Sequence, residues 1–166
     1  MKKQVVIIGG GYGGLAVMRR LPQLLGRERY AIKIIDKSEH HCVKTRFHEI
    51  ATTPSRDTLI RFPLRDLARL SGAEFTRAEV SEIDFANRKL AAGGEEFRWD
   101  ILVSAAGAET DFFGVEGAAE HAASVWTYEK ALGCGRRAEA LCGCGGAARI
   151  ALCGAAGLAR APLYGM

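Results

Sequence analysis

The stretch VVIIGGGYGGLAVMRRL, residues 5–21, constrains the fold of this chain more than any other part of the sequence. Its first four residues are an unbroken apolar, β-branched run, which predicts a strand buried on both faces. Gly9, Gly11 and Gly14 then complete a G-x-G-x-x-G pattern, and a helical pattern begins at Leu15. In this context of strand, turn and helix, the pattern indicates a dinucleotide-binding site. A ligand-free turn between packed elements is the alternative, because glycine is common in this chain.

Each glycine of the pattern has a separate structural purpose. Gly9 permits a tight turn, Gly11 lets the backbone approach a pyrophosphate, and Gly14 lets the helix pack closely on the strand. A second apolar strand ends at Asp36, about 20 residues later, where an acidic side chain accepts hydrogen bonds from an adenosine ribose. That carboxylate would repel a 2′-phosphate, so we expect an unphosphorylated adenosine ribose. The candidate binding residues here are Gly9, Gly10, Gly11, Tyr12, Gly13, Gly14, Asp36 and Lys37.

The composition limits the classes of function. With 48% hydrophobic and 25% charged residues, the 166-residue chain has the balance of a globular protein with one ordinary domain. Lysines and arginines are scattered and the net charge is only +4, which disfavours nucleic-acid binding. No apolar run has the length of a transmembrane helix. Five cysteines without a framework spacing fit a reducing compartment. We therefore expect a cytoplasmic protein, with peripheral attachment to the inner face of a membrane left open.

The other apolar runs predict an α/β fold. A helix over about residues 13–25 should connect the first strand to a second one at 31–35 through a right-handed crossover. A further apolar run at 101–103 predicts a third parallel strand, whose carboxyl end carries small residues at the edge where such sheets bind ligands. Together these elements predict a Rossmann-like, three-layer FAD/NAD(P)-binding domain with a parallel sheet. The expected core residues are Val6, Ile8, Leu15, Ile34, Leu67, Ile101 and Val103.

Two further segments lie between the second and third predicted parallel strands. Phe62, Pro63 and Leu64 should open a short helix, with Pro63 at its first helical position, and Gly72 should end it. The buried face of this helix is expected to be made by Leu64, Leu67, Ala68 and Leu70. Short alternating runs then predict antiparallel strands with one solvent-facing surface, at 74–77, 79–85, 89–92 and 95–99. We therefore expect a small antiparallel β-meander inserted in the crossover.

Three of the four histidines fall in one polar segment, residues 37–53. The segment holds residue types that bind zinc, namely His40, His41, Cys42, His48 and Glu49. Their spacing lacks the paired motif of a zinc site, so we interpret the segment as a polar loop that either passes near a cofactor or is simply solvated. No metal site is predicted.

In combination these motifs resemble those of the two-dinucleotide-binding-domain flavoprotein reductases. The glycine turn, the meander and the sequence WDILVSAAG at 99–107, followed by ETDFFGVEGAAEHA, are most similar to the type II NADH:quinone dehydrogenases. The resemblance covers about residues 4–132. It implies FAD in the first site, NADH as co-substrate and a quinone as electron acceptor. Because the flavin would carry the hydride transfer, no catalytic acid or base is expected from the protein.

The resemblance also assigns residues to the cofactor. It implies that the turn glycines hold the FAD pyrophosphate and that Asp36 holds the adenosine ribose. Val80 matches the family position whose backbone faces the adenine. Ala106 and Gly107 match an A-T-G turn near the flavin, with alanine in place of the threonine.

The loop after the second strand departs from the family pattern. The family has an apolar, proline-containing segment there, whereas this chain has Arg46 within VKTRF at 43–47. Arg46 either contacts the cofactor or is a surface arginine, and the sequence leaves both open. The chain also lacks the C-x4-C pair of related disulfide reductases, because only Cys42 is present. A dithiol mechanism is therefore not expected.

Residues 133–166 differ in composition from the rest, being rich in glycine, alanine and arginine, with four of the five cysteines. Residues 149–158 weakly resemble the start of an NADH domain, with Ala156 where close pyrophosphate approach requires glycine. The cysteines lack the spacing of structural zinc sites; they are Cys134, Cys142, Cys144 and Cys153. We expect an FAD-binding domain at 1–132 and an atypical tail at 133–166, either a remnant of an NADH domain or out-of-frame sequence. The fold would then be incomplete relative to the family.

The sequence leaves three functional hypotheses. The first is an FAD-dependent NADH dehydrogenase of the quinone-reducing type, as a fragment or a subunit completed by another chain; sulfide:quinone and ferredoxin reductases share the same first domain. The second is a nucleotide-binding module without redox activity. The third is an inactive remnant. A homo-oligomer is compatible with all three.

Overall fold

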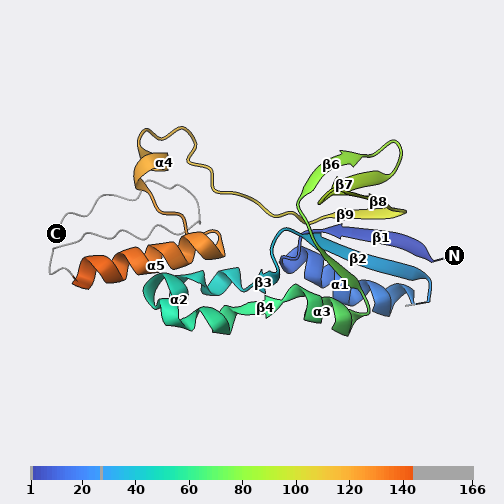
Figure 1. Ribbon diagram of the computed structural model, residues 1–166, viewed down its shortest axis with the longest axis horizontal. Helices are drawn as coiled ribbons and strands as arrows, with labels where there is room; N and C mark the ends of the chain where they lie inside the picture. Colours follow the sequence, from blue (N-terminus) through green and yellow to red (C-terminus); the bar gives the residue numbers. More distant parts are fainter. Residues whose placement is uncertain (1, 27, 144–166) are drawn as a thin grey trace.

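A four-stranded parallel sheet forms the centre of the computed structural model, which describes residues 2–26 and 28–143 (Figure 1). The strand order is β5 (Glu74–Arg77), β2 (Tyr30–Asp36), β1 (Lys3–Ile8) and β9 (Ile101–Ser104). β1 pairs with β2 on one side and with β9 on the other. The central position of β1 explains why its apolar run does not alternate with polar residues, as the sequence predicted.

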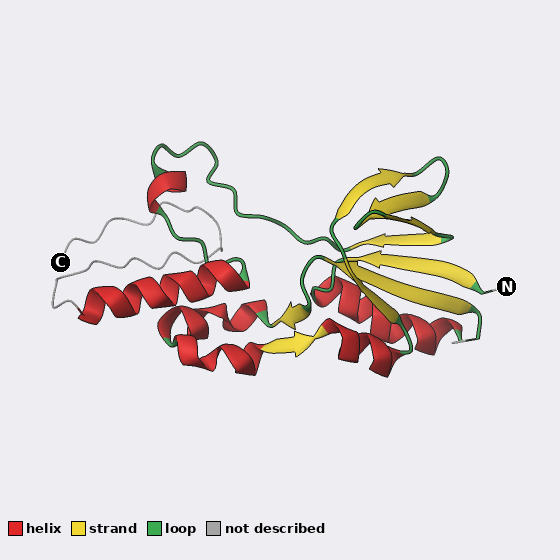
Figure 2. Ribbon diagram, viewed as in Figure 1, coloured by secondary structure: helices red, strands yellow, loops and turns green. Residues whose placement is uncertain are grey.

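The two faces of β1 contribute to two separate cores. Val5 and Ile7 face helices α1 (Tyr12–Leu25) and α3 (Leu64–Ser71), from which Met18 and Ala68 complete the first core. Val6 lies in the second core together with Ile8, under a layer of antiparallel strands. Figure 2 shows the helices on one side of the sheet and the second group of strands on the other. The fold is therefore the expected α/β arrangement of three layers.

The antiparallel layer is a three-stranded meander of β6 (Val80–Asp84), β7 (Lys89–Ala92) and β8 (Glu95–Arg98). Leu90 and Phe97 point into the second core and are almost fully buried. The prediction of a fourth antiparallel strand at 74–77 is wrong, because that segment is β5 and pairs in parallel with β2. An edge strand of the central sheet also has one exposed side, so its sequence alternates like a meander strand.

Two predicted core positions are also wrong. Ile101 is 37% exposed because it begins β9, which is an edge of the central sheet among the described strands. Leu70 is 73% exposed on α3, where Leu64 and Ala68 are fully buried. The other predicted core residues are buried or pack against the two cores: Val6, Ile8, Leu15, Ile34, Leu67 and Val103.

Helix ends agree with the expected signals. α3 stops at Gly72, which is left-handed with φ +71° and whose N–H donates to the carbonyls of Ala68 and Arg69. α1 starts one residue before the predicted position and runs on to Leu25 with Pro22 inside it. Pro22 is buried within the helix.

A second lobe is built from the segment between β2 and α3 together with the last described helix. It contains β3 (His40–Cys42), a 3₁₀ turn at Lys44–Arg46, α2 (Phe47–Thr52), a second 3₁₀ segment at Pro54–Ile60 and β4 (Arg61–Pro63). Helix α5 (Tyr128–Gly143) packs along α2, and their shared core is Phe47, Ile50, Ile60 and Ala131 (Figure 1). A long loop with the short helix α4 (Ala118–His121) connects β9 to α5.

The boundary predicted after residue 132 falls inside α5, and it stays a prediction. Cys144, Cys153 and the segment 149–158 lie outside the described residues. Among the helices at residues 2–26 and 28–143, none is both long enough and apolar enough to cross a bilayer.

Candidate functional site

Three segments that are distant in the sequence meet at the carboxyl ends of β1, β2 and β9. The N–H of Gly9 donates to the carbonyl of Ile35, with an N–O distance of 2.8 Å, so the glycine turn lies against the end of β2. The N–H of Ala105 donates to the carbonyl of Ile8, also at 2.8 Å, which brings the segment after β9 to the same turn. The carboxyl edge of a parallel sheet is where open α/β folds bind ligands.

Packing explains two of the three pattern glycines. Gly9 has φ +101°, and an added Cβ would overlap the carbonyl group of Ala105. At Gly14 an added Cβ would overlap the carbonyl oxygen of Gly9, so α1 lies as close to the end of β1 as its backbone allows. These two glycines are required by the fold itself.

Gly11 is different, because no side chain or backbone in the described part of the chain fills the space where its Cβ would lie. Within residues 2–26 and 28–143, and apart from its two chain neighbours, no heavy atom lies within 4 Å of the position that its Cβ would take. Gly11 is the N-cap of α1 and has no side chain that could cap the helix, and the first turn of α1 holds no acidic residue. Free N–H groups at a helix N-terminus attract anions. The open side of the turn therefore has the shape and the polarity that a phosphate requires.

Asp36 is held beside this turn by two backbone donors. Its Oδ2 accepts the N–H of Gly10 at 2.5 Å, and its Oδ1 accepts the N–H of Ser38 at 2.7 Å. An ionised carboxylate has about four acceptor positions, so capacity for further donors such as ribose hydroxyls remains. The spacing argument that selected Asp36 from the sequence thus corresponds to direct contact with the glycine turn.

His41 is a member of the site that sequence reasoning missed. Its side chain is only 7% exposed, and its Nδ1 lies 2.9 Å from the carbonyl oxygen of Gly10. The ring of Tyr12 meets the imidazole edge-on with centroids 5.1 Å apart, and the Tyr12 hydroxyl is 3.3 Å from Oγ1 of Thr45. Nothing in a polar run with three histidines distinguishes the one that is buried.

Two of the predicted basic residues are engaged with carboxylates. Lys37 is exposed at the edge of the site, and its hydrogen bond to Glu79, at 3.2 Å, raises the pKa of the ammonium group. Arg46 binds Glu49 through two nitrogens, at 2.6 and 2.8 Å. This pairing raises the pKa of Arg46 and lowers that of Glu49. The guanidinium of Arg46 is thus already occupied by a neighbour in its own segment.

The remaining predicted residues surround the carboxyl edge without a direct bond to the turn. Val80 begins β6 and packs against the second core, and the N–H of Ala78 just before it donates to the carbonyl of Asp36 at 3.0 Å. Gly107 has φ +85°, and Ala106 lies close to Gly9. The sequence therefore selected segments that the fold does bring together.

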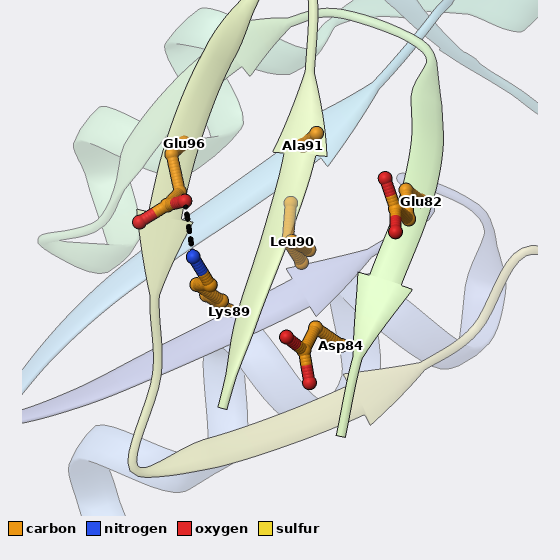
Figure 3. A pocket seen from close by; sticks show the side chains of 6 residues that line it. All are labelled: Glu82, Asp84, Lys89, Leu90, Ala91 and Glu96. Carbon is orange, nitrogen blue, oxygen red and sulfur yellow. Dashed lines mark hydrogen bonds and ion pairs between the residues drawn. The ribbon is translucent and has the colours of Figure 1, made fainter. Parts of the chain in front are cut away.

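A separate hollow, whose lining includes no residue of the glycine turn, lies on the outer surface of the meander (Figure 3). Within it Lys89 pairs with Glu96 at 2.8 Å. Its lining is Glu82, Asp84, Lys89, Leu90, Ala91 and Glu96. We attach no function to it. Within residues 2–26 and 28–143, no three histidine, cysteine, aspartate or glutamate side chains gather as metal ligands would.

Comparison with protein families identifies the kind of protein to which this site belongs. A family model described as pyridine nucleotide-disulphide oxidoreductase matches residues 3–159, nearly the whole chain. The chain belongs to the pyridine nucleotide-disulphide oxidoreductase family. This family comprises flavin-dependent oxidoreductases that bind FAD and NAD(P)H. The matched range includes the glycine turn, Asp36 and the meander.

Comparison with individual proteins finds quinone oxidoreductases among the similar proteins. The chain is 31% identical over 121 residues to the type II NADH:quinone oxidoreductase of Staphylococcus aureus, covering 73% of this chain and 30% of that protein. The sulfide:quinone oxidoreductase of Aquifex aeolicus superposes with a TM-score of 0.76 at 29% identity, covering 85% of this chain and 32% of the other.

NDH2 from Plasmodium falciparum in complex with NADH superposes with a TM-score of 0.73 at 16% identity, over 87% of this chain and 30% of the other. At 16% identity, this structural similarity shows a shared fold and nothing more. The chain thus spans about 30% of the length of the curated relatives that it matches.

Proposed function

We propose that this chain forms the FAD-binding part of an NADH:quinone oxidoreductase. The observation that carries the proposal is the turn between β1 and α1, which is open to the outside at Gly11 and lies beside the carboxylate of Asp36. The similarity to the Staphylococcus aureus type II NADH:quinone oxidoreductase supports the quinone-reducing type within the family.

In this proposal, backbone groups hold the phosphates of FAD and a side chain holds its sugar. The N–H groups from Gly11 to Gly14, including those of Tyr12 and Gly13, face the pyrophosphate, where the helix dipole also favours negative charge. Asp36 accepts hydrogen bonds from the adenosine ribose. The N–H of Gly10 is already donated to Asp36, so Gly10 contributes by keeping the carboxylate in place.

The other predicted residues would contact the two ends of the cofactor. The backbone at Val80 would face the adenine, and Ala106 with Gly107 would lie near the flavin. Lys37 would stay at the rim, paired with Glu79. Arg46 would reach the cofactor only by leaving Glu49, so we expect it to contribute less than the backbone groups.

The flavin, when bound, supplies the redox chemistry by accepting a hydride from NADH and passing electrons to a quinone. The residues of this chain would bind and orient FAD, and we assign none of them a role as proton donor or acceptor. Because the chain spans about 30% of its curated relatives, we propose the NADH and quinone sites for the complete enzyme.

A sulfide:quinone oxidoreductase is the second candidate. It is favoured by the likeness to the Aquifex aeolicus enzyme, which has the higher TM-score and identity of the two structures described above. The two candidates share the proposed FAD site and differ in the electron donor. Reduction of a quinone by NADH or by sulfide, assayed with a complete enzyme carrying this segment, would separate them.

Equilibrium titration with FAD, NAD and NADP tests the cofactor proposal. We expect FAD to bind at least about tenfold more tightly than NAD, a difference of about 1.4 kcal/mol, with quenching of flavin fluorescence as the signal. NADP should bind most weakly, because Asp36 repels a 2′-phosphate. Binding of NAD without FAD would instead identify a nucleotide-binding module without a flavin. Binding of none of the three would contradict the proposal altogether.

A further inference from the structure

The peptide group between Gly10 and Gly11 is restrained at its carbonyl end by a buried histidine. Nδ1 of His41 lies 2.9 Å from the oxygen of Gly10. A carbonyl oxygen can only accept, so Nδ1 carries the proton and donates it to Gly10. The preceding peptide is restrained too, because the N–H of Gly10 donates to Asp36. Two consecutive peptide groups of the turn are thus held by side chains from β3 and β2.

The geometry of the peptide bond then determines where the next donor points. In a planar trans peptide, the C=O of one residue and the N–H of the next point in opposite directions. The carbonyl of Gly10 points inward to His41, which is 7% exposed. The N–H of Gly11 must therefore point to the opposite side. Among the described residues, apart from its two chain neighbours, no heavy atom lies within 4 Å of the position that a Cβ on Gly11 would take.

We propose that His41 is a positioning residue of the nucleotide-binding turn: by donating from Nδ1 to the Gly10 carbonyl, it directs the N–H of Gly11 outward to the phosphates of a dinucleotide. The proposal rests on the function proposed above. A glycine peptide without such a restraint rotates readily, because glycine has few forbidden backbone angles. His41 removes that freedom before the ligand arrives, which lowers the entropic cost of binding.

The surroundings of His41 fit this role. β3 pairs with β4 with His41 opposite Phe62 and His40 opposite Pro63, and neighbouring strand residues point to opposite faces. His41 is therefore directed to the turn, whereas Nδ1 of His40 is 3.2 Å from Arg61. The Tyr12 ring lies edge-on to the imidazole of His41 and helps to fix its orientation.

Two substitutions separate the hydrogen bond from the packing of the ring. His41→Phe keeps an aromatic ring against Tyr12 but has no donor. His41→Asn loses the ring, but its amide nitrogen is the same number of bonds from Cα as Nδ1 and can donate to Gly10. We expect FAD affinity to fall about tenfold in His41→Phe and to stay within about threefold of the wild type in His41→Asn. A residue that served only for packing would give the reverse order, and that result would overturn the proposal.

NMR of the protein without nucleotide provides a readout that does not depend on FAD binding. The ¹⁵N shifts of the His41 ring should report a proton on Nδ1, and the amide signal of Gly11 should move in His41→Phe but much less in His41→Asn. A neutral ring protonated on Nε2, or a Gly11 amide unchanged in His41→Phe, would overturn the proposal. If wild-type protein fails to bind FAD, the proposed function falls, and these NMR signals alone decide whether His41 positions the turn.

Discussion

Replacing Gly11 with valine is expected to abolish FAD binding while leaving the fold in place. The backbone at Gly11 has φ −75° and ψ −167°, which valine adopts without strain. Apart from the two chain neighbours, no heavy atom of the described residues lies within 4 Å of the added Cβ. The valine side chain would instead fill the space proposed for the pyrophosphate. We expect an affinity loss of at least about 100-fold, equivalent to about 2.7 kcal/mol. Stability should fall by only about 1 kcal/mol, because valine is a poorer N-cap residue than glycine.

Gly14→Ala is the matched control. It adds a smaller side chain three residues from Gly11, and it is expected to destabilise the fold, which Gly11→Val leaves in place. Alanine would improve helix propensity by about 1 kcal/mol. The added Cβ, however, overlaps the backbone oxygen of Gly9, which no side-chain rotation can relieve. Overpacking costs typically about 1–3 kcal/mol, and a clash with rigid backbone lies at the upper end of that range, so the clash outweighs the propensity.

Thermal unfolding and FAD titration of both variants distinguish the two roles. For a chain of this size, 1 kcal/mol shifts Tm by about 2–4 °C. We expect a decrease of that size in Gly11→Val and a decrease of about 4–8 °C in the unliganded Gly14→Ala protein, for a net cost of about 2 kcal/mol. If Gly11→Val bound FAD with unchanged affinity, the pyrophosphate could not lie where we propose.

Local patterns were sufficient to predict the elements around the turn. The β-branched run at residues 5–8 predicted a doubly buried strand, and the three glycines with Asp36 at the right distance predicted how β1, α1 and β2 meet. These features are encoded within about 30 consecutive residues, because one βαβ unit contains all its own partners. The meander strands were predicted for a similar reason, since each pairs with the next one along the chain.

The errors arose where a partner lies far away in the sequence. β5 pairs with β2 about 40 residues earlier, and nothing in residues 74–77 distinguishes a parallel edge strand from a meander strand. Ile101 continues an apolar run, but its burial depends on whether another strand follows β9 in the sheet. His41 was missed for the same reason, because its contact with Gly10 joins residues 31 positions apart.

Asp36 was predicted in part. Its spacing from the turn predicted a ribose-binding role, but the sequence did not predict its hydrogen bond to the turn itself. The sequence predicted a ribose ligand. The structure adds that Asp36 also accepts the N–H of Gly10, a buried residue of the turn, and the N–H of Ser38. A residue that maintains the turn and contacts the ligand should affect both properties when it is replaced.

Replacing Asp36 with alanine is therefore expected to lower both stability and nucleotide affinity. The N–H of Gly10 would be left buried without an acceptor, which lowers the free energy of unfolding by about 1–3 kcal/mol. The middle of that range corresponds to a decrease in Tm of about 4–8 °C. FAD affinity should fall about 30-fold, because a hydrogen bond to a charged group contributes about 1.5–3 kcal/mol. ADP carries the same ribose and pyrophosphate, so its affinity should fall by the same factor.

Glu39→Gln is the control for charge, because it removes one negative charge three residues from Asp36 without contact to the turn. Glu39 pairs with Arg77 at 2.8 Å on the surface, and an exposed pair of this kind contributes at most about 1 kcal/mol. Unchanged FAD and ADP affinities in Glu39→Gln, with parallel losses in Asp36→Ala, would assign the effect to the carboxylate at the turn. A loss of stability in Asp36→Ala without any loss of affinity would show that Asp36 only supports Gly10, and the ribose would then need another partner.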